Sequence, residues 1–254
     1  MKGLAGPEAS GAARALARRL AAYEEGALRV HAAARALAAM DPETAVDLLA
    51  ALARSGGAGE RAGWAAVGQA LSRPEPLLSY AWRAELYAAA VERGLAEVSG
   101  LLVAPPPLRS YEAPRDRADT RLAHLTLGHK KALARANRDP DLLARLAAEG
   151  EPVVVRELLR NPQLTEEFVV RIAARRPIRP GTLRCLLETR RWRTRPAVAL
   201  AIARNPYVET GVALELLPFL AAADLADVAR DGTVHPLVRA LARRLAAARL
   251  PRMA

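Results

Sequence analysis

Apolar residues recur at intervals of three and four positions from Gly11 to about Gly94, and glycine or proline separates one apolar run from the next. This spacing places the apolar side chains on one face of a helix, so it predicts a series of amphipathic helices. The expected helices span residues 8–22, 27–39, 42–54, 59–72 and 75–94. Their bulky aromatic residues are expected in the core rather than in a ligand site: Trp64, Tyr80, Trp82 and Tyr87.

A proline-rich segment at residues 104–116 interrupts this pattern. Its four prolines are incompatible with a continuous helix, and the three consecutive ones favour an extended, semi-rigid chain. We therefore predict three parts: an N-terminal helical region over 1–103, a linker over 104–116, and a second helical region over 117–254.

The second region contains an internal repeat. An Arg-Asp or Arg-Asn pair precedes Pro140, Pro162 and Pro206, and these prolines lie 22 and then 44 residues apart, which indicates a period of about 22 residues. Sliding residues 153–175 onto 197–219 keeps the apolar positions in register. The copy between them is expected to be irregular, because its proline lies at position 180 instead of near 184.

Each proline corner has a mechanical interpretation. Arginine ends one short helix, Asp or Asn leaves helical geometry, and proline opens the next helix. Such short helices cannot bury an apolar face alone, so successive units must stack into one core. The sequence therefore predicts an all-α fold, an α-solenoid of short repeats behind an N-terminal helical region, with the helix from Pro236 to about Leu250 capping its far end.

The repeated unit resembles HEAT-like repeats, and especially the shorter leucine-rich repeat variant. The resemblance rests on the Arg-Asn-Pro corner, the segment Leu164-Thr165-Glu166-Glu167, an apolar helix, and a Pro-x-Val-x-Arg-like return. It covers roughly residues 117–250 and is similar to a branch of bacterial proteins built on this unit. Variant repeats can accompany a cysteine-ligated iron–sulfur cluster, but this chain has only Cys185, so the resemblance implies no cofactor here.

Charge is distributed unevenly between the two regions. The 254-residue chain has a formal net charge of +11. Residues 1–116 carry 13 basic and 13 acidic residues, whereas residues 117–254 carry 25 basic and 14 acidic residues. The whole positive excess therefore lies in the second region, which indicates that the two regions have separate tasks.

The densest positive charge lies between residues 171 and 195, where Glu188 is the single acid. Guanidinium groups bind carboxylate or phosphate through paired hydrogen bonds, and an indole offers a stacking face. Stacked repeats would align such side chains along one surface. The predicted partner-binding residues are Arg171, Arg175, Arg176, Arg179, Arg184, Arg190, Arg191, Trp192, Arg193 and Arg195.

Several functions are compatible with this cluster. The leading hypothesis is a non-enzymatic scaffold that binds an acidic protein segment. The alternatives are sequence-independent nucleic-acid binding, binding of anionic lipid, and a solvated, partly ion-paired surface with no partner. The remaining alternative is a HEAT-like DNA glycosylase. Such enzymes use tryptophans and a carboxylate in a basic cleft, so this alternative needs Trp192 outside the core and beside an acid, although no such motif aligns with this chain.

No residue pattern points to catalysis or to a metal. His124 and His129 would point to different sides of a helix. Cys185 lies on an apolar helix face, which is typical of a buried thiol. The glycines of segment 55–59 lack the Lys-Ser/Thr that follows a phosphate-binding loop. We therefore predict that the protein is not an enzyme and has no cofactor.

The expected location is the cytoplasm. No apolar run reaches the roughly 18 to 20 residues that a membrane-spanning helix needs. The first residues lack the apolar block of a secretory signal. A single cysteine is compatible with a reducing compartment.

Overall fold

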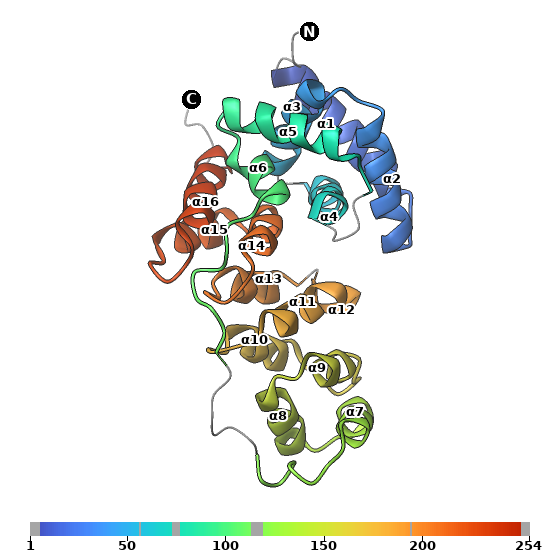
Figure 1. Cartoon of the computed structure of the whole chain (residues 1–254), viewed down its shortest axis with the longest axis vertical. Helices are drawn as coiled ribbons and strands as arrows, with labels where there is room; N and C mark the ends of the chain where they lie inside the picture. The colour runs from blue at the N-terminus through green and yellow to red at the C-terminus, as the bar shows by residue number, and fades with distance from the viewer. Residues whose placement is uncertain (1–5, 56, 73–76, 113–118, 194, 250–254) are drawn as a thin grey trace. The chain divides into compact units, whose positions relative to one another are not determined.

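The computed structural model describes residues 6–55, 57–72, 77–112, 119–193 and 195–249, which form an all-α fold without a strand among them (Figure 1). The α-helices are α1 (Gly6–Ala21), α2 (Gly26–Ala38), α3 (Pro42–Arg54), α4 (Ala58–Ser72), α5 (Tyr80–Glu92), α6 (Ala96–Leu102), α7 (Leu127–Ala136), α8 (Pro140–Glu149), α9 (Pro152–Leu158), α10 (Glu166–Ala174), α11 (Pro180–Glu188), α12 (Arg190–Arg193), α13 (Pro196–Ala203), α14 (Thr210–Leu216), α15 (Ala222–Arg230) and α16 (Pro236–Arg249). One 3-10 turn, η1 (Leu217–Phe219), follows α14. The all-α prediction is confirmed.

The first four expected helices agree with α1 to α4 within two residues at each end. The fifth begins at Tyr80 instead of 75, because Ser79 is its N-cap and accepts a hydrogen bond from the Trp82 amide. Positions 75 and 76 lie outside the described residues. The short helix α6 was not expected from the sequence. None of the helices within the described ranges combines the length and the apolar character needed to cross a membrane.

The chain folds into two compact units. Unit 1 consists of Met1–Pro106, Thr210–Asp231 and Pro236–Ala254, and unit 2 consists of Pro107–Glu209 and Gly232–His235. The first boundary falls inside the expected linker at 104–116. The second region differs from the expectation of 117–254, since its last helices belong to the same unit as the N-terminal helices.

The C-terminal helices complete the core of unit 1. Helix α14 packs on α6 and α4, and α16 packs on α15, α3 and α6. Glu97 of α6 is only 1% exposed, and its carboxylate lies 3.2 Å from Nη1 of Arg244 and 3.8 Å from Nε of Arg54. These contacts hold α16 within unit 1, and the expectation that it caps the end of the repeat stack stays a prediction.

Two expected core aromatics are on the surface. Trp64 is buried and Trp82 is half-buried, with Nε1 of Trp82 donating to the Met40 carbonyl at 2.9 Å. Tyr80 and Tyr87 are exposed, because α5 turns its Leu86 side towards the core of unit 1 and these tyrosines away from it. Their placement in the core was therefore wrong.

Unit 2 contains two asparagine corners with the same hydrogen bonds. Nδ2 of Asn161, which follows α9, donates to the carbonyls of Ala134 and Asn137 at the end of α7, at 2.9 and 2.8 Å. Nδ2 of Asn205, which follows α13, donates to the carbonyls of Ala173 and Arg175 at the end of α10, at 2.7 and 3.0 Å. Both asparagines are buried.

The side-chain oxygens of these asparagines hold the turns that follow. Oδ1 of Asn161 accepts from the Gln163 amide at 2.9 Å, and Oδ1 of Asn205 accepts from the Tyr207 amide at 3.1 Å. Each asparagine therefore closes its own turn and caps the C-terminus of an earlier helix. Helix α7 packs on α9, and α10 packs on α13, so the two corners join equivalent helix pairs.

The three proline corners do not share one geometry. Pro140 opens α8 directly, with Asp139 as the N-cap whose side chain accepts from the Asp141 amide. Pro162 and Pro206 lie instead in turns before α10 and α14. The expectation that proline opens the next helix therefore holds only for the first corner, because asparagine at the other two directs its amide to an earlier helix.

The burial of side chains follows the alignment of 153–175 with 197–219. The aligned pairs that are buried in both segments include Val154 and Val198, Leu158 and Ile202, Leu164 and Val208, and Ile172 and Leu216. The expected continuation of this pattern into a solenoid stays a prediction.

We predict that Asn161→Asp lowers the free energy of unfolding by about 2–4 kcal/mol, because it removes two donors and places a carboxylate against two carbonyls. The opposite exchange, Asp139→Asn, is the control, and it should cost less than about 1 kcal/mol because asparagine can also act as an N-cap. Urea denaturation measures both values. Equal losses in the two variants would contradict the asparagine-corner interpretation.

Candidate interaction surface

The ten predicted partner-binding residues lie in unit 2, on α10 to α12 and the connections around them. Their surroundings decide which of them can meet a partner. They fall into four groups: side chains that bind carboxylates, side chains that bind backbone carbonyls or pack in the core, half-buried side chains with other partners, and side chains that remain open to solvent.

Three of the arginines form ion pairs with acids from other parts of unit 2. Arg179 pairs with Glu151, and Arg184 pairs with Glu209. Arg195 lies 3.4 Å from Glu166. The excess charge of residues 171–195 is therefore partly neutralised by acids that lie outside this segment of the sequence.

Arg179 also joins a segment of the expected linker to α11. Its guanidinium lies 5.8 Å from the ring centroid of Tyr111, and its Nε donates to the Tyr111 hydroxyl at 3.4 Å. The hydrogen bond with Tyr111, and next to it the charge of Glu151, raises the pKa of Arg179 above its usual value. The Arg109 amide donates to the Pro206 carbonyl at 2.9 Å, so this part of the expected linker packs on unit 2.

Two further arginines bind backbone carbonyls. Nη2 of Arg176 donates to the carbonyl of Arg204, just after α13, at 2.8 Å. Arg191 donates to the carbonyls of Asn161 and Leu164 at 3.2 and 2.9 Å, so it holds the first asparagine corner from the other side. These side chains satisfy carbonyls that the short helices and turns leave unpaired.

Trp192 is a core residue. Its side chain is 2% exposed, its Nε1 donates to the Leu159 carbonyl at 2.8 Å, and the Arg191 guanidinium lies 4.3 Å from its ring centroid. Its inclusion among the partner-binding residues was therefore wrong, since the indole is already covered by the protein itself. The stacking face on which the glycosylase hypothesis depended is not available to a base.

The remaining arginines differ in their surroundings. Arg171 is exposed, and its guanidinium lies 5.5 Å from the ring centroid of Phe168. Arg190 is exposed, and it makes no hydrogen bond or ion pair with the rest of the described chain. Arg175 and Arg193 are half-buried and have partners of their own. Arg171 and Arg190 are thus the members of the predicted cluster that are most open to another molecule.

Helix α7 carries open cations that the sequence prediction missed. Lys131 and Arg135 lie one helical turn apart, Arg138 follows the helix, and all three are exposed without an ion pair in the described ranges. A search for dense positive charge along the sequence overlooks them because they lie outside residues 171–195. Their spacing of four and three positions could have indicated one common face.

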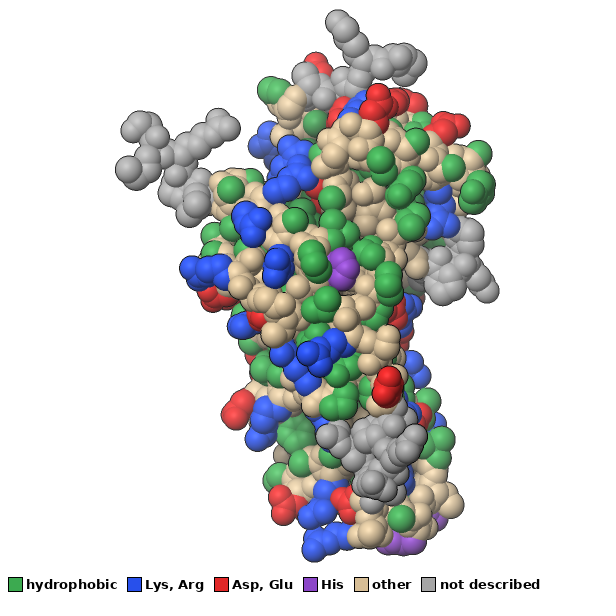
Figure 2. Space-filling view, turned by 60° about the vertical axis from the view of Figure 1, so that its left-hand side comes forward, with side chains coloured by type: hydrophobic (Ala, Val, Ile, Leu, Met, Phe, Trp, Pro, Cys, Tyr) green, Lys and Arg blue, Asp and Glu red, His purple; other side chains and the backbone are tan. Residues whose placement is uncertain are grey.

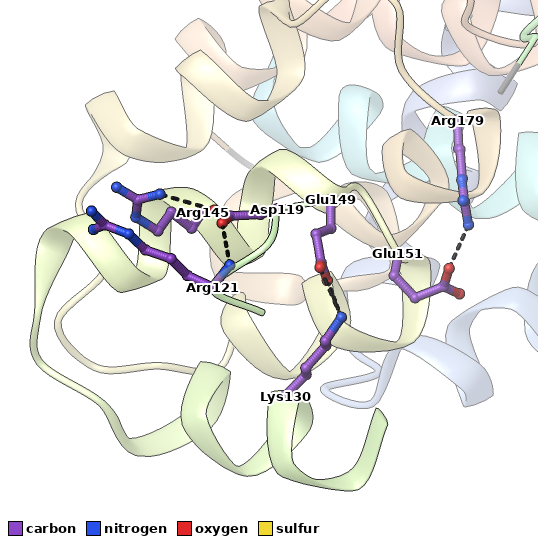
Figure 3. A network of polar contacts seen from close by, with 7 residues as sticks. All are labelled: Asp119, Arg121, Lys130, Arg145, Glu149, Glu151 and Arg179. Atoms are coloured by element: carbon purple, nitrogen blue, oxygen red, sulfur yellow. Dashed lines mark hydrogen bonds and ion pairs between the residues drawn. The ribbon is translucent and has the colours of Figure 1, made fainter. Parts of the chain in front are cut away.

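Other cations of α7 and α8 differ from these open ones, because they form ion pairs within unit 2 (Figure 3). Lys130 pairs with Glu149 at 2.7 Å, which joins α7 to the end of α8. Arg145 of α8 pairs with Asp119 at 3.0 Å. The hydrogen bond from Arg145, together with the Arg121 amide, lowers the pKa of Asp119 below its usual value.

The positive excess of the chain lies mainly in unit 2. Its sequence ranges hold 21 basic and 12 acidic residues, whereas those of unit 1 hold 17 basic and 15 acidic residues. On the face drawn in Figure 2, Lys and Arg side chains form separate groups with hydrophobic and acidic side chains between them. The described side chains visible on this face therefore form no single continuous basic stripe.

Cys185 is buried, its Sγ lies 3.5 Å from the Pro152 carbonyl, and burial raises the pKa of its thiol. His, Cys, Asp and Glu side chains within the described ranges form no group of three or more that could hold a metal ion.

We predict that two neighbouring arginines contribute very differently to stability. Arg191→Ala should lower the free energy of unfolding by about 1–3 kcal/mol, because two carbonyls lose their donor and Trp192 loses its cover. Arg190→Ala should change it by less than about 0.5 kcal/mol, because that side chain is solvated. Thermal or urea unfolding of both variants tests this, and a larger loss for Arg190→Ala would show that the assignment is reversed.

The likeness to HEAT-like repeats stays a prediction after comparison with known proteins. No family model, no curated protein and no solved structure matches this chain.

Proposed function

We propose that the protein is a non-enzymatic helical-repeat scaffold whose basic unit 2 binds an acidic segment of another protein. The observation that carries this proposal is the set of open cations on unit 2, defined here as Lys131, Arg135, Arg138, Arg171 and Arg190. They lie in the unit that holds most of the positive excess. Carboxylates are the natural partners of such guanidinium and ammonium groups.

The distribution of aromatic residues favours a protein partner over a single-stranded nucleic acid. Single-stranded nucleic acids are bound through base stacking on aromatic rings next to basic side chains. In unit 2 the indole of Trp192 is buried, and Tyr111 and Phe168 lie against the guanidinium groups of Arg179 and Arg171. An acidic peptide needs only cations, so it suits these open side chains better.

We predict that Arg171→Glu/Arg190→Glu weakens binding of a fluorescent glutamate-rich peptide by about tenfold, because two attractive charges become repulsive. Fluorescence anisotropy at low salt measures the affinity. Arg191 is left unchanged, since its loss would disturb the fold and not only the surface.

The matched control is Arg18→Glu/Arg19→Glu, which makes the same change in net charge on exposed arginines of α1 in unit 1. It should leave the affinity within about twofold of the unchanged protein. If both variants bind the peptide equally well, the surface is not specific to unit 2 and the proposal fails.

Nucleic acid is the second outcome of the same experiment. Its binding would fall steeply with salt, with a log–log slope of about −0.9 for each duplex phosphate neutralised. Tighter binding of duplex or single-stranded DNA than of the acidic peptide, at one salt concentration, would replace the protein partner with the nucleic-acid alternative.

A further inference from the structure

Helix α5 is apolar on two opposite sides. Its outward side carries Tyr80, Tyr87 and Val91, which are 86%, 38% and 53% exposed. Ala84 and Ala88 lie between them and are also exposed. Positions 80, 84, 87, 88 and 91 share one face of a helix, so these side chains form a continuous apolar stripe, called here the α5 stripe.

The opposite side of α5 fixes the helix in unit 1. Leu86, Ala89 and Ala90 are buried, and α5 packs on α3 and α6 (Figure 1). The Trp82 indole adds its hydrogen bond to the Met40 carbonyl. The α5 stripe is therefore presented by a helix that is already anchored, and its exposure does not depend on loose packing.

Exposed apolar residues on one helix face are unusual in such number. Single exposed apolar side chains are ordinary, but a contiguous stripe with two tyrosines is typical of a surface that another molecule covers. Tyrosine is well suited to this role, because it contributes a large apolar area and a hydroxyl that stays compatible with water.

The charges beside the stripe are negative. Glu85 and Glu92 are exposed and lie on the same flank of α5. The arginines of this region are used internally: Nη2 of Arg83 donates to the Leu71 carbonyl at 3.0 Å, and Arg93 pairs with acids of α3. The flank open to a partner is therefore acidic.

We propose that the α5 stripe docks the apolar face of an amphipathic helix from another protein, and that this helix carries Lys or Arg beside its apolar face. Amphipathic helices bind their partners through apolar side chains three and four positions apart. The side chains of the α5 stripe have the same spacing. Glu85 and Glu92 select the basic flank. This partner has a charge opposite to that of the acidic segment proposed for unit 2, so the two proposals stand or fall separately.

The test uses the full chain and a synthetic amphipathic peptide with leucines on one face and lysines beside them. We expect measurable binding that Tyr80→Ser/Val91→Ser weakens by about tenfold, because the largest anchors are removed. Tyr23→Ser/Leu28→Ser is the matched control, since these residues are also exposed apolar side chains of unit 1, at 41% and 53%. The control should leave the affinity unchanged.

A charge exchange makes the test specific. Glu85→Lys/Glu92→Lys should transfer preference from the lysine-flanked peptide to a glutamate-flanked peptide of the same apolar face. Loss of binding that is equal in stripe and control variants would overturn the proposal. So would a concentration-dependent dimer of the unchanged protein that Tyr80→Ser/Val91→Ser abolishes, because the stripe would then belong to a second copy of this chain.

Discussion

The carbonyl groups at the ends of short helices are the constraint on which unit 2 depends. A helix of two or three turns leaves a large share of its carbonyls without an intrahelical partner. In unit 2 several of these groups receive hydrogen bonds from side chains of later elements: Asn161 for α7, Asn205 for α10 and Trp192 for Leu159, the residue after α9. Each helix is thus completed by chain that follows it.

This constraint explains why the arginine cluster is a poor guide to the binding surface. Guanidinium groups can satisfy several acceptors at once, so a fold of short helices uses them at turns and helix ends. Arg191 binds two carbonyls, and Arg179 binds a carboxylate and a tyrosine. A high density of arginine along the sequence therefore includes side chains that hold the fold together as well as side chains that charge its surface. Only arginines without such internal hydrogen bonds or ion pairs are free to bind a partner.

Local features of the fold could be predicted from the sequence, and long-range ones could not. Helices α1 to α4 follow from apolar periodicity, and α3 begins where Asp41 accepts from the Thr44 amide. The pairing of Arg184 with Glu209 joins residues 25 positions apart, and no local pattern indicates it. The return of α14 to α16 into unit 1 was missed for the same reason, because an amphipathic face does not identify the helix that will cover it.

The surface of α5 shows where the sequence held a signal that the prediction did not use. Aromatic residues were assigned to the core by type, although Tyr80 and Tyr87 lie on the side of the helix opposite to Leu86. A helix that is apolar on two sides can bury both only if each side has something packed on it. In α5, the helices α3 and α6 cover only the Leu86 side. The same argument separates the two proposed surfaces: on unit 2 the unused groups are positive charges, whereas on α5 they are apolar side chains beside negative charges. A single partner chemistry cannot satisfy both, so the two proposals call for partners of opposite charge.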